Sequence, residues 1–240
     1  MTGNFWTKKV PPLFVIMLFI SLPTFGKPMT DDYLTQFKQL KDAQNKLKSY
    51  TCTYTSEQKR NVNYGLFDTN SITILKFDIA FDSGKSKFSR EYISGTDDKK
   101  PISKKEFEKK QKEVNSQIGF DASNRWEMDP MNPNWDITLD SIDSETSTNI
   151  AFKTTIKRKD AKREETAIFT FDKKTFAPLI FVVTHDEKIG NISHSKETIH
   201  YTKVGQFYVI TKKITEVTGS KIGIKAKFNT TLTVSNYQFK

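Results

Sequence analysis

Residues Ile72–Phe81 have the sequence ITILKFDIAF, in which apolar side chains occupy every second position through most of the stretch. The apolar members Leu75, Phe77, Ile79 and Phe81 alternate with Lys76, Asp78 and Ala80. Alternation with a period of two is typical of an antiparallel strand that buries one face and leaves the other in water. The same pattern recurs in Asn149–Arg158, Ala167–Phe171 and Lys221–Phe228. The chain is therefore predicted to be mainly β.

Short polar or Gly-containing segments separate these stretches and predict turns. They are Asp82-Ser83-Gly84-Lys85, Asp172-Lys173-Lys174, Ile189-Gly190-Asn191 and Thr218-Gly219-Ser220. The stretch Lys221–Phe228 follows the last of them, and its alternation predicts a single strand. The whole pattern predicts about ten antiparallel strands.

A helix is predicted ahead of the strands, over Thr30–Ser49. Its apolar residues recur at helical spacing and form one stripe: Tyr33, Phe37, Leu40 and Leu47. Thr30 or Asp31 can cap its N-terminus. Because the helix has one apolar face to bury, we expect that face to pack on another element.

Residues 94–134 interrupt the strand pattern. Ser103 and Glu106 have the spacing of a capping box, which predicts a second, mostly polar helix from there to about Ile118. An irregular segment with four large apolar residues follows: Trp126, Met128, Met131 and Trp135. We expect this insert to be either a plug under the sheet or a mobile lid.

Composition limits the class of protein. A chain of 240 residues with 36% hydrophobic residues and nineteen Phe has enough apolar material for one core, which we assign to a single domain over residues 27–240. One Cys excludes a disulfide scaffold. No G-x-S-x-G, P-loop, H-E-x-x-H or C-x-x-C motif is present. We expect a monomer that is not an enzyme and needs no cofactor.

The net charge of +10 suggests contact with an anionic surface. The basic stretches Lys99–Lys112 and Lys153–Arg163 lack the interleaved aromatic residues of a nucleic-acid binder, so nucleic acid is not an expected partner. His185 and His194 flank a predicted hairpin loop and could face each other across it. Surface histidines at strand ends are the alternative to a metal site there.

The N-terminal residues 1–26 have the features of a secretory signal peptide. Lys8 and Lys9 precede the apolar run Leu13–Ile20, and Thr24-Phe25-Gly26 offers small residues for cleavage before Lys27. The alternative is an uncleaved anchor helix, but a membrane span needs about 20 apolar residues. We therefore expect an exported, processed protein.

Three segments resemble the outer-membrane lipoprotein-sorting (LolA-like) family of diderm bacteria. Phe169–Leu179 is similar to that family's strand, D-x-x-T turn and Pro-led next strand. Ile199–Tyr208 resembles its Tyr-containing strand, Gly turn and following strand, and Ser235–Phe239 resembles its closing strand. The order of one helix, a long antiparallel meander and a helical insert also agrees.

The resemblance implies a periplasmic protein with a curved, incomplete antiparallel β-barrel, wrapped around the N-terminal helix and the mid-chain helical insert. It also implies an apolar hollow that accepts the acyl chains of lipid or lipoprotein, in transport and outer-membrane biogenesis. The candidate lining residues are Leu75, Phe77, Ile79, Phe81, Phe152, Phe169, Phe171, Trp126, Met128, Met131 and Trp135. Two alternatives remain: a lipid carrier with a hollow barrel, or an envelope protein-interaction or stress-sensing module whose core is filled.

Overall fold

The computed structural model describes residues 29–82, 85–115, 131, 135–158, 164–185, 192–221 and 223–240. The predicted signal peptide and the residues 116–130 and 132–134 of the insert lie outside this part of the chain. The elements in chain order are α1 (Asp31–Gln44), β1 (Ser49–Asn63), β2 (Asp68–Asp82), β3 (Lys85–Asp97), β4 (Lys100–Pro101), α2 (Lys104–Asn115), β5 (Trp135–Glu145), β6 (Asn149–Arg158), β7 (Glu164–Asp172), β8 (Pro178–His185), β9 (Ile192–Val204), β10 (Phe207–Lys221) and β11 (Ile224–Phe239).

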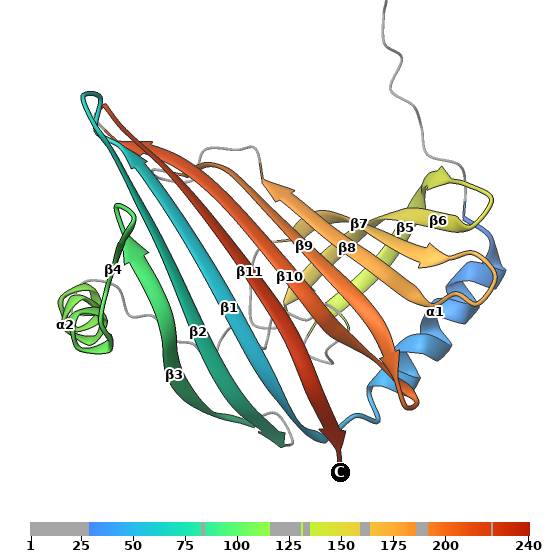
Figure 1. The fold of residues 1–240 in the computed structure, drawn as a ribbon. Coiled ribbons are helices and arrows are strands. Elements are labelled where there is room, and N and C mark those ends of the chain that lie inside the picture. The colour runs from blue at the N-terminus through green and yellow to red at the C-terminus, as the bar shows by residue number, and fades with distance from the viewer. Residues whose placement is uncertain are drawn as a thin grey trace, which may run out of the picture.

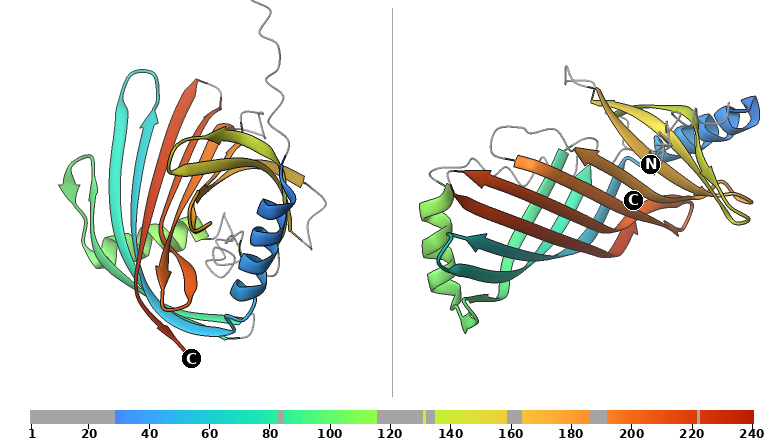
Figure 2. Two further views of the ribbon diagram at one scale, coloured as in Figure 1. Left: turned by 90° about the vertical axis from the view of Figure 1, so that its right-hand side faces the viewer. Right: turned by 90° about the horizontal axis from the view of Figure 1, so that it is seen from above.

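All the described strands join one antiparallel sheet of eleven strands, in the order β4-β3-β2-β1-β11-β10-β9-β8-β7-β6-β5. The sheet does not close, because β4 and β5 are separate edges. The strands curve and bend the sheet into an open half-barrel (Figures 1 and 2). The expectation of a mainly β, antiparallel and incomplete barrel is confirmed, with eleven strands in place of about ten.

The first helix is shorter than the sequence predicts, because β1 already begins at Ser49, where that helix was expected to end. Thr30 is at the N-cap, but its side chain makes no capping hydrogen bond. Phe37 and Gln44 are the buried residues of α1. Phe37 belongs to the predicted stripe, whereas a buried glutamine was not expected.

The second helix has the predicted capping box. Within it, the Ser103 hydroxyl and backbone N–H both donate to the Glu106 carboxylate, at 2.8 and 2.7 Å, and the N–H of Glu106 donates to the Ser103 hydroxyl at 3.3 Å. The Phe107 ring stacks on Tyr92 of β3 with centroids 4.7 Å apart, which fixes α2 to that strand. Thus α1 and α2 lie at opposite ends of the sheet (Figure 2), and wrapping of the sheet around both helices stays a prediction.

The prediction of a single strand over Lys221–Phe228 is wrong. β10 continues through Gly219 to Lys221, and β11 begins at Ile224. The turn needs a residue in the left-handed region, and Gly223 supplies it with φ of +77°. Within the described residues, neither helix is long and apolar enough to cross a membrane.

Candidate ligand-binding face

One face of the sheet is apolar along a row that crosses ten strands. From β3 to β5, the register pairs Tyr92, Leu75, Ser56, Leu232, Lys213, Ile199, Phe181, Phe169, Phe152 and Ile142, each with the next. Every member is buried except Tyr92, which is half-buried. Residues directly opposite on neighbouring strands point to the same side of a sheet. We call this side the inner face.

At the β6–β8 end, aromatic rings fill the space between the inner face and α1. Tyr33 meets Phe152 edge-on at 5.4 Å between ring centroids, and Phe37 meets Phe169 and Phe171 at 6.4 and 6.1 Å. The rings of Phe169 and Phe171 are themselves 4.4 Å apart. Phe152, Phe169 and Phe171 are fully buried, so this end of the inner face is a packed core.

A reversed turn adds another ring to this core. The Asp172 carboxylate accepts hydrogen bonds from the Thr175 hydroxyl and N–H and from the Lys174 N–H, and these bonds lower the pKa of Asp172. This geometry is the D-x-x-T turn that the sequence indicated. Beyond it, Phe176 adopts a positive φ of +54° and stacks on Phe171 at 4.4 Å.

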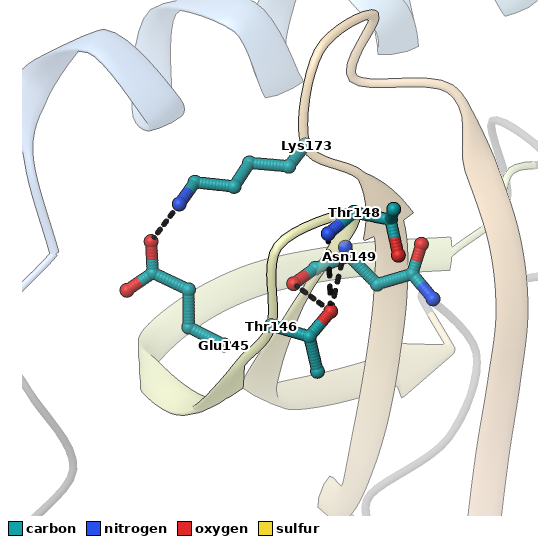
Figure 3. Close-up of polar contacts among 5 residues, drawn as sticks. All are labelled: Glu145, Thr146, Thr148, Asn149 and Lys173. Atoms are coloured by element: carbon teal, nitrogen blue, oxygen red, sulfur yellow. Dashed lines mark hydrogen bonds and ion pairs between the residues drawn. The ribbon is translucent and has the colours of Figure 1, made fainter.

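The neighbouring β5–β6 loop is tied to the same turn. Lys173 Nζ lies 2.6 Å from Glu145 Oε1, and this carboxylate raises the pKa of Lys173 (Figure 3). In the same loop, the Thr146 hydroxyl accepts from the N–H groups of Thr148 and Asn149, at 3.3 and 2.9 Å. These contacts hold the loop and turn beside the aromatic core, and they suggest a structural role for both.

The inner face continues over β1, β2 and β11, away from α1 (Figure 1). Its buried apolar residues here are Cys52, Tyr54, Leu75, Phe77, Ile79, Leu232 and Val234. Phe81, near the end of β2, is half-buried and stacks on Tyr50 with centroids 5.1 Å apart. Burial raises the pKa of the Cys52 thiol to about 12, with repulsion from Asp78 as the second cause.

Two polar features interrupt this apolar surface. Lys213 is only 7% exposed, and its Nζ lies 2.6 Å from Glu197 Oε1. Ser56 is fully buried two strands away. Sequence alternation missed Lys213 because β10 has a bulge between Ile210 and Lys212, and the extra residue turns Lys213 inward. The Lys213–Glu197 ion pair thus places one ammonium group and one carboxylate at a fixed position on the otherwise apolar inner face.

A second unexpected residue is Gln44, at the end of α1. β10 pairs with β9 from Phe207 onward but with β11 only from Lys212 onward, so the first residues of β10 leave one side open. The Gln44 side chain fills this gap: its Nε2 donates to Tyr208 O, and the Tyr208 N–H donates to Gln44 Oε1 at 3.3 Å. The amide thus replaces a neighbouring strand.

A groove of about 410 Å³ runs between α1 and β5, lined by Leu34, Phe37, Lys38, Lys41, Asp42, Asn45, Trp135, Asp136 and Ile137.

Most of the predicted lining residues lie on or beside the inner face. Leu75, Phe77, Ile79, Phe152, Phe169 and Phe171 belong to one buried cluster, which also contains Met131, and Trp135 packs against it. Trp126 and Met128 lie outside the described residues. Whether this set contacts a ligand stays a prediction, as does the lid or plug role of the insert.

The possible contact between His185 and His194 is not formed. Ser195, not His194, is opposite His185, and a shift of one residue places His194 on the other face of the sheet. His185 Nε2 instead lies 3.4 Å from Glu165 Oε2. Among the residues that the structure describes, no group of three or more His, Cys, Asp or Glu side chains could hold a metal.

No protein-family model and no curated protein matches the sequence. Among solved structures, an outer-membrane lipoprotein-sorting protein domain from Vibrio parahaemolyticus is 10% identical, with a TM-score of 0.39, covering 85% of this chain and 91% of that chain. A DUF1329 family protein from Desulfovibrio piger is 12% identical, with a TM-score of 0.39 and coverages of 89% and 94%. Lipovitellin is 8% identical, with a TM-score of 0.33, covering 80% of this chain and 25% of its own.

One of these solved structures is named for the lipoprotein-sorting family that three segments of the sequence resemble.

Proposed function

We propose that this protein is an exported, non-enzymatic binder or carrier of lipid or lipoprotein acyl chains. The observation that supports it is the extent of the inner face, which stays apolar across β1, β2 and β11 after the aromatic packing against α1 ends. The side chains of this stretch are already buried, so the free-energy gain for an acyl chain comes from burial of its own CH₂ groups, about 0.8 kcal/mol each. A surface of this kind suits such a ligand.

The Lys213–Glu197 pair gives the proposed site its polar point. Lys213 shares the buried row with Leu232 and Ile199, and its ammonium group is paired with the Glu197 carboxylate. A ligand with an apolar chain and one polar, hydrogen-bonding group would match both parts of this surface. The proposed ligand class is therefore a fatty-acyl lipid or the acylated end of a lipoprotein.

A titration with a dansyl-labelled fatty acid tests the proposal. Parent protein should bind the probe and raise its fluorescence, and Phe77→Ala should change the affinity with a moderate loss of stability. Ile93→Ala is the matched control, because Ile93 is half exposed on β3. If parent protein does not bind the probe and Phe77→Ala costs about 3–5 kcal/mol of unfolding free energy, the core is filled and an interaction module is the better account.

Export is tested separately. N-terminal sequencing of the protein from its host should begin at or near Lys27, because Thr24-Phe25-Gly26 fits a signal-peptidase site. A membrane-embedded protein that still begins at Met1 would contradict the periplasmic assignment.

A further inference from the structure

The hairpin that joins β1 to β2 ends in apolar side chains that point into solvent. Leu66 is 97% exposed, Phe67 61% and Tyr64 39%. The turn is well built: the Tyr64 N–H donates to Phe67 O at 3.0 Å, and Gly65 has φ of +89°, as a two-residue turn with Gly first requires. Turns of this kind usually carry polar residues, so apolar side chains here call for a partner.

A second hairpin tip lies beside the first. Asn63, the last residue of β1, pairs with Lys225 of β11, so the Tyr64–Phe67 turn adjoins the β10–β11 turn (Figure 1). Ile224, the first residue of β11 after that second turn, is 39% exposed. Ile192, 40% exposed, begins β9 at the same end of the sheet. Of the nine large apolar side chains that the described residues expose, five lie at this end, and we call them the apolar tip: Tyr64, Leu66, Phe67, Ile192 and Ile224.

Basic residues surround the apolar tip. Within four residues of the two turns, four basic residues occur with one acid: Arg60, Lys221, Lys225 and Lys227 with Asp68. Farther back along the strands, basic and acidic residues pair with one another. Glu57 lies 2.6 Å from Lys59, and Glu216 pairs with Lys196 in the sheet. Lys225 and Lys227 are both exposed, directly behind the tip. The end of the sheet therefore has apolar side chains at its tip and positively charged side chains next to them.

We propose that this end of the sheet docks on a bilayer that contains anionic phospholipid. Leu66 and Phe67 enter the boundary between headgroups and acyl chains, and Lys225 and Lys227 contact the phosphates. A narrow apex of apolar side chains with long basic side chains behind it matches the layering of that boundary. The net charge of +10 adds long-range attraction to an anionic leaflet. This docking goes beyond the proposed binding of an acyl chain on the inner face, and neither requires the other.

Vesicle flotation tests the docking. The processed protein, which begins at Lys27, and its variants are mixed with vesicles of phosphatidylcholine alone or with 30% phosphatidylglycerol (about one anionic lipid in three, enough to set a surface potential). Parent protein should float with the anionic vesicles, and less so at high salt, because screening weakens charge attraction. Leu66→Asp should weaken binding about tenfold or more, since it removes the apolar side chain that enters the bilayer and adds a negative charge.

Two further variants make the result specific. Lys225→Gln should weaken binding about fivefold, as expected for one lysine at an anionic surface. Leu34→Asp is the matched control: Leu34 is 43% exposed on α1, far from the tip in Figure 1, and its variant should bind like the parent. Equal binding of Leu66→Asp and parent would overturn the proposal, as would equal loss in Leu66→Asp and Leu34→Asp. No binding of parent protein to either vesicle would also overturn it and leave the apolar tip to a protein partner.

Discussion

Phe169 shows how one residue links the sheet to the helix. Its ring contacts Phe37 of α1 and also Phe181, at centroid distances of 6.4 and 5.2 Å, and the side chain is fully buried. Phe169→Ala should therefore cost about 3–5 kcal/mol of unfolding free energy, because the vacated space is enclosed by rings that cannot collapse into it. Chemical denaturation measures this cost. Phe67→Ala, at a 61% exposed position, is the control and should change stability by about 0.5 kcal/mol or less.

Cys52 gives a second test at the residue scale. Its thiol has a pKa of about 12, raised first by burial and then by the charge of Asp78. At pH 8, about one thiol in ten thousand is then a thiolate, which is the reactive form. Iodoacetamide should leave the native protein unmodified over hours and modify it promptly in denaturant, as mass spectrometry can follow. Rapid modification of the folded protein would show that the β1–β2 region opens far more readily than its burial indicates.

At the scale of elements, α1 acts both as a layer and as part of the sheet. Phe37 packs on the aromatic core, and Gln44 completes the open side of β10 at Tyr208. Gln44→Leu should cost about 1–3 kcal/mol, because it leaves the Tyr208 N–H and C=O without these partners. Gln39→Leu, at an exposed position of the same helix, should have little effect. Equal effects of the two variants would mean that water replaces the Gln44 amide at no cost.

The elements also show what sequence patterns can predict. Alternation correctly predicted β6, the Ser103–Glu106 spacing predicted the start of α2, and the family resemblance indicated the D-x-x-T turn, because each depends on local side chains. The β10–β11 turn was misplaced, since both Gly219 and Gly223 could supply it and only the pairing with β11 decides. The burial of Lys213 and Gln44 could not be predicted from sequence patterns. A bulge in β10 turns Lys213 inward, and Gln44 is buried because the first residues of β10 do not pair with β11.

At the scale of the whole molecule, the open sheet has one packed end and one apolar stretch away from α1. The packed end follows from the aromatic rings that α1 and the Asp172 turn bring together. The stretch over β1, β2 and β11 is the part of the inner face that we assign to an acyl chain. The apolar tip lies outside this assignment, on the hairpin ends.

Native mass spectrometry of the protein, purified from its host without detergent, tests this assignment most directly. The account predicts ions heavier than the processed polypeptide by the mass of an acyl lipid, which collisional activation releases as a fatty-acid-containing species. An apolar chain on a buried face should survive gentle purification, because its return to water costs about 0.8 kcal/mol for each CH₂. Ions of the bare polypeptide alone, from cells that supply lipid, would contradict the claim that the inner face carries an acyl chain.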